Sequence, residues 1–204
     1  MPDSSLRLSS ITAATNGKLK DENEDVLAPF SFEHFRPYDI AGNCAPETKL
    51  TVARWLYIFT HRGTGFGDRI GSRVKITEIS VSGMPNEPEK KEARVVAEII
   101  VDEDMTNPQG VIHGGCSMYL VDILSTLPLS ALDFEQGGAG NAGVSQAIHT
   151  VFHAPARMGD NLRIVSTSLS VGGRTMTCRC EIWDTTNHRL VVSATQVKMQ
   201  STRL

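Results

Sequence analysis

A carboxylate in the middle of a strongly apolar segment is the feature of this sequence that most clearly indicates chemistry. Asp122 lies within 116–132, whose large apolar residues are Met118, Leu120, Val121, Ile123, Leu124, Leu127 and Leu129. At about 100° per residue these side chains cover most of a helix circumference, which predicts a helix buried nearly all round. An unpaired carboxylate is costly to bury. Asp122 therefore has either a buried partner or a role in a reaction.

The residues just before this helix could bind an oxyanion. The entry reads Gly-Val-Ile-His-Gly-Gly and ends in Gly114 and Gly115 at the predicted helix start. Glycines there let a ligand approach the backbone closely, and the first helical turn carries free N–H groups and a partial positive charge. This arrangement suits an anion or a developing oxyanion. A plain tight turn is the alternative that these residues alone leave open.

The elements that must hold these residues form an α+β pattern. An amphipathic helix is predicted over 46–61, where Val52, Trp55, Leu56 and Phe59 recur at i, i+3, i+4 and i+7. A second, longer helix is predicted over 114–127. Strands are predicted over 73–82, 93–102, 144–153, 162–171, 174–184 and 190–199. Short strands joined by turns indicate an antiparallel sheet packed on a single helix.

Other segments are predicted to interrupt or precede these elements. Pro128 should kink or end the long helix. A loop is expected over 133–143, which contains four glycines, and a turn or longer loop over 83–88. Residues 1–45 are polar and acidic without sustained periodicity, which predicts a tail that is mostly disordered or loosely docked. Residues 46–204 then form one domain that includes the amphipathic helix.

Composition excludes several functional classes. The net charge of −3 argues against general nucleic-acid binding, which needs a basic surface. No apolar run reaches the roughly 18 to 20 residues of a membrane span, so no membrane span is expected. Arg7, Lys18 and Lys20 lie among serines and threonines, as in a mitochondrial presequence, but an acidic run follows them. A cytoplasmic location is therefore expected, with mitochondria as the alternative.

Cysteine and histidine spacing argues against a metal site. The four cysteines include no CxxC pair, so they are expected to be free, mostly buried thiols in a reducing compartment. His149 and His153 share one face of a predicted strand, but no third ligand is evident near them. No bound metal is therefore expected.

The segment Asn107–Gly115, followed by Asp122 nine residues after its histidine, resembles the signature of hotdog-fold acyl-CoA thioesterases. It is nearest to the phenylacetate-pathway type and the type called THEM-two. Gly143–Ser145 and Phe152–Asp160 also resemble that family in order and spacing, so that the resemblance covers 73–200. It implies a hotdog fold, in which an antiparallel sheet wraps around one long central helix, here with an added N-terminal helix. It also implies that two subunits join their sheets edge to edge.

The resemblance implies catalytic roles for five residues. Gly114 would donate its N–H to the thioester oxygen, and Asp122 would act as nucleophile or as general base on water. Asn107 would position the nucleophile or the thioester, His113 would orient the loop, and Ser145 would hold the water or the substrate. The implied reaction hydrolyses a fatty or aryl acyl-CoA to free acid and CoA. No cofactor is implied, because CoA is part of the substrate.

The same resemblance implies contacts with the CoA moiety. The matching positions are Phe152, Pro155, Arg157, Gly173 and Arg174. The two arginines are candidates for binding the phosphates of CoA. For each of them, an ordinary solvated arginine at a strand end is the alternative.

The spacing of Gly114 and Asp122 predicts a site built from two chains. Eight residues on one helix separate their backbones by roughly 12 Å, at about 1.5 Å per residue. An oxyanion donor and a nucleophile must each lie within about 3 to 3.5 Å of one carbonyl group. If both residues act, Asp122 must come from a second chain. An obligatory homodimer with two composite sites is predicted, and two such dimers are expected to form a homotetramer.

Two other functions remain open on the sequence alone. A non-catalytic acyl-CoA-binding or scaffold protein of the same fold would bind the ligand without turnover. The presence of Asn107, Gly114 and Asp122 together favours catalysis over that alternative. A hotdog dehydratase is the other candidate, but its chemistry usually pairs a catalytic histidine with a carboxylate in a different arrangement.

Overall fold

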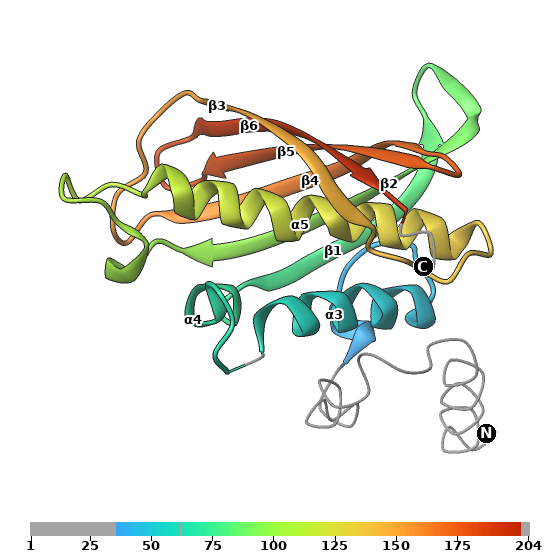
Figure 1. Cartoon of the computed structure of the whole chain (residues 1–204), viewed down its shortest axis with the longest axis horizontal. Helices are drawn as coiled ribbons and strands as arrows, with labels where there is room; N and C mark the ends of the chain where they lie inside the picture. Colours follow the sequence, from blue (N-terminus) through green and yellow to red (C-terminus); the bar gives the residue numbers. More distant parts are fainter. Residues whose placement is uncertain (1–35, 62, 201–204) are drawn as a thin grey trace. The chain divides into compact units, whose positions relative to one another are not determined.

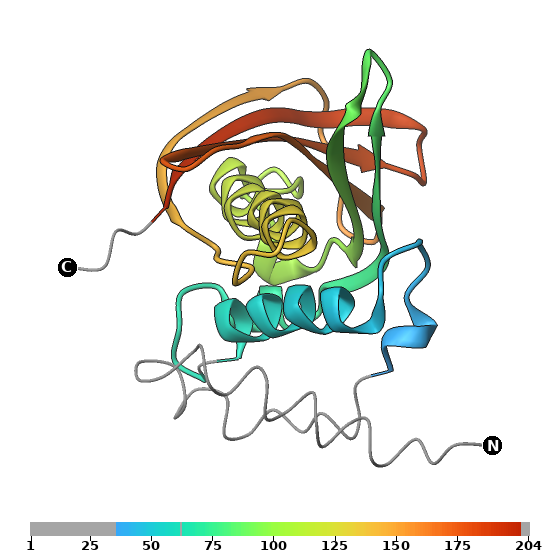
Figure 2. The same cartoon turned by 90° about the vertical axis from the view of Figure 1, so that its right-hand side faces the viewer.

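A six-stranded antiparallel sheet wraps around one long helix in the computed structural model, which describes residues 36–61 and 63–200. The helix is α5 (Gly114–Glu135), and Figures 1 and 2 show it lying against the inner face of the sheet. The sheet order is β1-β2-β4-β5-β6-β3. The strands are β1 (Lys75–Met84), β2 (Glu87–Ile100), β3 (Val144–Phe152), β4 (Asn161–Val171), β5 (Thr175–Asp184) and β6 (Arg189–Met199). The predicted α+β class and the sheet around a central helix are both confirmed.

Alternation along the strands places the core between the sheet and α5. On β5 the side chains of Met176, Cys178, Cys180 and Ile182 are all fully buried, while the residues between them are exposed or half-buried. Successive side chains of a strand point to opposite faces, so an alternating sequence of this kind buries one whole face against the helix. All four cysteines are free, and three of them are buried while Cys116 is half-buried.

The helix α5 continues through Pro128, so this residue does not end the helix, which was one of the two predicted outcomes. A proline inside a helix removes one backbone hydrogen bond and costs about 3 kcal/mol. Leu124, Leu127, Leu129 and Leu132 are each at most 2 % exposed on the same helix. Burying one leucine contributes about 1.5 to 3 kcal/mol, so packing outweighs the proline. The glycine-rich loop is correspondingly shorter than predicted and begins after Glu135.

Among the helices that the structure describes, α5 is the one long and apolar enough to cross a membrane by length and composition. Of its most apolar window, 78 % is buried inside the protein. That burial is what the central helix of a folded domain requires.

The hairpin between β1 and β2 is longer than the sequence predicted. Strand pairing continues to Met84 and Glu87 across a tight turn, so most of the expected 83–88 loop is strand. Residues 87–91 are exposed, and the hairpin projects past the rest of the sheet in Figure 2. A projecting hairpin has no core to face, so its residues carry no apolar alternation from which a strand could be predicted.

A second helix, α3 (Pro46–Thr60), packs against α5, and Figure 2 shows it on the side away from the sheet. It confirms the predicted amphipathic helix, with Val52 and Leu56 buried. Trp55 Nε1 donates to the carbonyl of Gly140 at 2.6 Å, which fixes α3 to the loop after α5. A short helix, α4 (Asp68–Gly71), follows in the glycine-rich segment where only a break was expected.

The ordered chain starts before residue 46, which corrects the boundary of the predicted tail. Residues 37–39 form a short 3-10 helix, and Ile40 and Cys44 are buried. The buried Lys49 ammonium donates to the carbonyls of Ile40 and Gly42 at 2.7 and 3.1 Å, which holds this segment in place. The prediction of disorder for residues 1–35 lies outside the described residues.

The two edges of the sheet differ in how they are covered. Along β1, Ala41 exchanges backbone hydrogen bonds with Thr77 and Ile79, and the Asn43 side chain bonds the backbone of Val81. The opposite edge strand, β3, pairs on one side with β6 and has no strand on its other side within residues 36–61 and 63–200. Apolar side chains are exposed along it, namely Val144, Val151 and Phe152. An uncovered edge with exposed apolar residues is a surface on which another chain can pair.

Candidate active site at the two ends of strand β3

Asp122 has polar partners from two strands. Its Oδ1 accepts hydrogen bonds from Ser145 Oγ at 2.7 Å on β3 and from Gln196 Nε2 at 2.6 Å on β6. Gln196 is fully buried and is held from the other side by Ser125, which donates to its Oε1. Asp122 itself is only half-buried. The carboxylate is therefore fixed in orientation while it remains accessible.

A buried lysine completes this cluster. Lys198 on β6 is 4 % exposed, and its Nζ lies 2.7 Å from Thr126 Oγ1 and 3.4 Å from Ser145 Oγ. Burial lowers the pKa of Lys198, and the negative charge of the nearby Asp122 opposes part of that shift. The cluster therefore sets an ammonium group, a hydroxyl and a carboxylate next to one another.

Gln196 and Lys198 are site residues that the sequence did not predict, although their positions in β6 indicate an inward-facing pair of polar residues. Val192, Ala194, Gln196 and Lys198 occupy alternate positions of β6, and all four are buried. Two polar residues therefore continue the inward face of an otherwise apolar strand. Buried polar groups of this kind require partners, and here the partners are the predicted site residues Asp122 and Ser145.

The entry of helix α5 lies at the opposite end of β3 from this cluster. His113 is the N-cap residue of α5, and its Nδ1 accepts from the Gly115 N–H at 2.9 Å. Gly114 follows at the first helical position, where no carbonyl of a preceding turn can accept its N–H. No other acceptor for that N–H lies in the described part of the chain. The Asn107 side chain accepts from the Gln109 N–H at 2.9 Å and so shapes the loop that leads into the helix.

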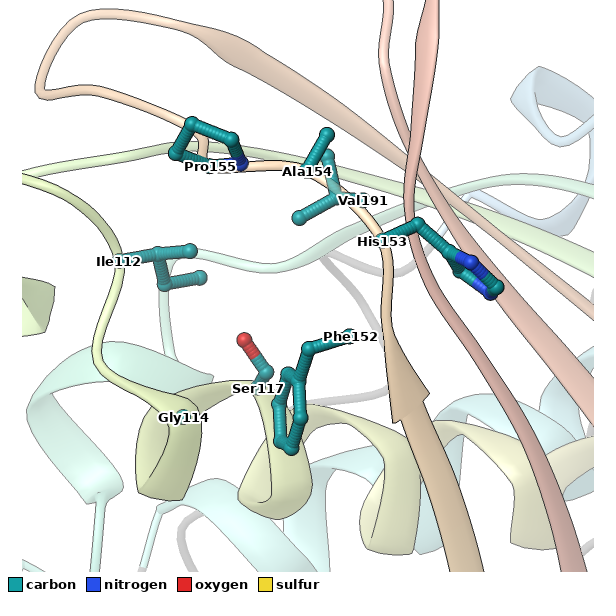
Figure 3. Close-up of a pocket in the computed structure, with 8 residues that line it drawn as sticks. All are labelled: Ile112, Gly114, Ser117, Phe152, His153, Ala154, Pro155 and Val191. Atoms are coloured by element: carbon teal, nitrogen blue, oxygen red, sulfur yellow. The ribbon is translucent and has the colours of Figure 1, made fainter.

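Gly114 lines an open pocket of about 370 Å³, shown in Figure 3. The lining residues are Ile112, Gly114, Ser117, Phe152, His153, Ala154, Pro155 and Val191. In Figure 3 the Phe152 ring lies alongside the first turns of α5, while His153 is directed away from the pocket. His153 Nε2 lies 2.8 Å from Ser193 Oγ instead. The pocket is therefore mainly apolar, with the helix N-terminus at one wall.

The structure divides the predicted site residues between the two ends of β3. Ser145 near the start of β3 bonds Asp122. Phe152 at its end lies beside Gly114, where a Cβ would come 3.4 Å from the ring. The loop of Asn107 and His113 belongs to the Gly114 end, and Asp122 does not line the Gly114 pocket. Two half-sites result, one holding the carboxylate and one holding the free N–H.

The predicted CoA contacts are divided in the same way. Phe152 and Pro155 line the pocket at the Gly114 end. Arg157 follows them in the chain, and its backbone forms an antiparallel β-bridge with Val111. Gly173 and Arg174 lie in the turn between β4 and β5, one strand away from the start of β3, because Thr175 and Val144 pair with Met199 of β6 from opposite sides. Within one chain, therefore, Arg157 and Arg174 lie at different half-sites.

A known protein family matches the segment of the chain that contains residues of both half-sites. The family model described as the thioesterase superfamily matches residues 109–191, a span that contains Gly114, Asp122 and Ser145. This segment of the chain is therefore similar to the thioesterase superfamily. Acyl-coenzyme A thioesterase 13 of Mus musculus is 27 % identical to this chain over 124 residues, which are 61 % of this chain and 79 % of the mouse protein. The Homo sapiens protein of the same name is 33 % identical over 79 residues, which are 39 % of this chain and 53 % of the human protein.

Solved structures of thioesterases show the same hotdog fold. Thioesterase superfamily member 2 of zebra fish superposes with a TM-score of 0.60 at 24 % identity, over 74 % of this chain and 97 % of the fish protein. Its counterpart from Mus musculus gives a TM-score of 0.58 at 22 % identity, over 78 % of this chain and all of the mouse chain. These likenesses show that the chain has the hotdog fold.

The cysteines of this protein are poor candidates for a nucleophile. Burial raises the pKa of Cys116 to about 11 and that of Cys180 to about 12. A thiol attacks only as its thiolate, and few such groups are ionised near neutral pH. The half-buried carboxylate of Asp122 is therefore the better candidate for the reacting group.

Proposed function

We propose that this protein is an acyl-CoA thioesterase that hydrolyses its substrate at two composite sites, each formed by the Gly114 half-site of one chain and the Asp122 half-site of a second chain. The observation that carries the proposal is the division of these groups between the two ends of β3, an edge strand that no other described strand covers. The relatives named acyl-coenzyme A thioesterase 13 support acyl-CoA as the substrate class. A hypothetical thioesterase protein from Streptococcus pneumoniae with this fold was solved with coenzyme A.

Edge pairing of β3 with its copy would bring the half-sites together. In an antiparallel pair with its twofold axis between Ile148 and His149, Ser145 of one chain lies opposite Phe152 of the other. Ser145 marks the Asp122 end and Phe152 the Gly114 end. A twofold interface is self-complementary, so one pairing would complete both sites. The exposed Val151 and Phe152 would also become covered.

The proposed chemistry follows from the groups that would meet. The Gly114 N–H would donate to the thioester oxygen and stabilise the negative charge that develops on it. Asp122 of the partner subunit would take the proton of a water, held with Ser145, whose oxygen attacks the carbonyl carbon. Alternatively, Asp122 would attack that carbon itself to form a mixed anhydride, which water hydrolyses to the free acid after CoA has left. The C–S bond then breaks, and CoA leaves as a thiolate that regains a proton. The proposal includes no cofactor, since CoA enters as part of the substrate.

The same pairing would unite the CoA candidates. Arg157 follows Phe152 at one end of β3, and Arg174 lies one strand away from the other end, across β6. Across the proposed dimer, Arg174 of the partner subunit would approach the mouth of the pocket lined by Phe152 and Pro155. Two guanidinium groups there could bind the phosphates of CoA.

We expect the purified protein to release free thiol from a panel of aliphatic and aryl acyl-CoA substrates, and to sediment as a dimer or a larger assembly. Turnover by a species that sediments as a monomer would refute the composite site. Binding of acyl-CoA without turnover of any panel member would favour the non-catalytic binding protein instead. The same sedimentation experiment tests the pairing of two dimers into a tetramer.

A second prediction concerns Lys198. We expect Lys198→Met to lower kcat/KM, because the variant removes the ammonium group that lies 2.7 Å from Thr126 Oγ1 and 3.4 Å from Ser145 Oγ, beside the Asp122 carboxylate. Steady-state release of free CoA measures the loss, and sedimentation should show the same assembly as the wild type.

Lys49→Met provides the matched control for Lys198. Lys49 is also a buried lysine, at 8 % exposure, but it bonds the carbonyls of Ile40 and Gly42. Its replacement should lower thermal stability and leave kcat/KM close to that of the wild type. If Lys198→Met retains the wild-type kcat/KM, Lys198 has no role at the carboxylate.

A further inference from the structure

Ser117 is a buried polar residue whose hydroxyl has no partner. It is 1 % exposed, and its Oγ makes no hydrogen bond in the described part of the chain. It lines the same pocket as Gly114, and Figure 3 shows its hydroxyl directed into the open space between Ile112 and Phe152. The orphaned group therefore faces the position that a substrate would occupy.

The unpaired Ser117 hydroxyl lowers the stability of the folded protein. A buried hydroxyl without a hydrogen bond loses its contacts with water and gains nothing in return. Alanine also has a higher helix propensity than serine. Stability alone would therefore favour alanine at position 117, and the hydroxyl requires a partner that the chain does not supply.

Geometry relates this hydroxyl to the Gly114 N–H. Ser117 stands three residues after Gly114 on α5, so the two lie on one face of the helix. Side chains of a helix lean toward its N-terminus, which brings the hydroxyl toward the first turn. The other side chains of the pocket are apolar, apart from His153, which lies against Ser193. Among the residues that line the pocket, Ser117 is therefore the side-chain donor left to an oxygen atom bound near Gly114.

We propose that the Ser117 hydroxyl is a second hydrogen-bond donor to the thioester oxygen, beside the Gly114 N–H. This inference rests on the proposed acyl-CoA hydrolysis and names one further residue that contacts the substrate. As negative charge develops on the thioester oxygen, the hydrogen bond strengthens. The contribution therefore falls mainly on kcat rather than on KM.

The test is Ser117→Ala with a series of acyl-CoA substrates. We expect kcat to fall at least about tenfold for every acyl group, since loss of one oxyanion donor costs on the order of 10²- to 10³-fold. The melting temperature should stay the same or rise, because the variant removes an unsatisfied group. Ser117→Thr, which retains the hydroxyl, should recover most of the lost kcat.

Ser166→Ala is the matched control, because Ser166 is equally buried at 1 % exposure but lies on β4, outside the pocket lining. It should leave kcat unchanged. The inference is overturned if Ser117→Ala retains the kcat of an active wild type, or loses melting temperature together with activity. A loss confined to acyl groups that carry an oxygen substituent also overturns it, in favour of a contact with the acyl chain. A wild type that hydrolyses no acyl-CoA overturns the proposed function and this inference together.

Discussion

Asp122→Asn is expected to lower kcat by about 10²- to 10⁴-fold, the range over which a general acid or base contributes. Asparagine has nearly the same shape, and its carbonyl oxygen can still accept from Ser145 and Gln196. The substitution removes the charge and the proton acceptor but preserves the local hydrogen bonds. Steady-state release of free CoA measures the loss, and sedimentation should show the same assembly as the wild type.

Asp133→Asn is the control for this variant. Asp133 lies on the same helix, and its carboxylate accepts from the N–H groups of Gly140 and Asn141. Its replacement removes a charge from α5 without touching either half-site, so kcat should stay close to that of the wild type. Full activity in Asp122→Asn would remove the carboxylate from the mechanism.

Gly114→Pro is expected to lower kcat by roughly 10²- to 10³-fold, because proline deletes the N–H proposed as an oxyanion donor. The first position of a helix is the one that tolerates proline best. His113 already has φ −67° and ψ 135°, the extended conformation that a residue before proline requires. The fold should therefore survive, as circular dichroism and the melting temperature would show.

Gly114→Ala separates the loss of the N–H from the added bulk. A Cβ at this position would lie 3.4 Å from the Phe152 ring, an ordinary van der Waals contact. Alanine keeps the backbone donor, so this variant should retain far more activity than the proline variant. Equal losses in the two variants would indicate that the space at Gly114 matters and that its N–H does not.

Asp122→Asn and Gly114→Pro together test whether one site spans two chains. In a heterodimer of the two variants, the Asp122→Asn chain supplies an intact Gly114 and the other chain supplies an intact Asp122. Random pairing makes half of the dimers mixed with one intact site each, so co-expression should restore about a quarter of wild-type activity. If both residues of a site came from one chain, the mixture would stay as inactive as its components.

The local sequence pattern was sufficient to predict the core elements. Alternation at Met176, Cys178, Cys180 and Ile182 predicted an inward face, and all four side chains are fully buried. Apolar residues around Asp122 likewise predicted the central helix. These predictions hold because the period of apolar residues reflects which face a helix or strand must bury. The fold class follows from such local periods together with the order of the elements.

The partners of Asp122 depend on contacts that no local pattern contains. Gln196 reaches the carboxylate from 74 residues further along the chain, because the sheet order sets β6 beside β3. Ala41 and Asn43 cover the edge of β1 through contacts that are likewise distant in sequence. The local sequence pattern had predicted that both residues belong to the N-terminal tail. Their covering of β1 leaves β3 as the edge without a covering strand in the described part of the chain.

The sequence by itself determined that Gly114 and Asp122 stand on one buried helix, too far apart to act on one carbonyl group. Only the tertiary structure decided which groups surround each of them and that β3 runs from one half-site to the other. The physical reason is that spacing along a helix is set by its local hydrogen bonds. Strand order is set by pairing between distant segments, whose energies depend on the whole sheet.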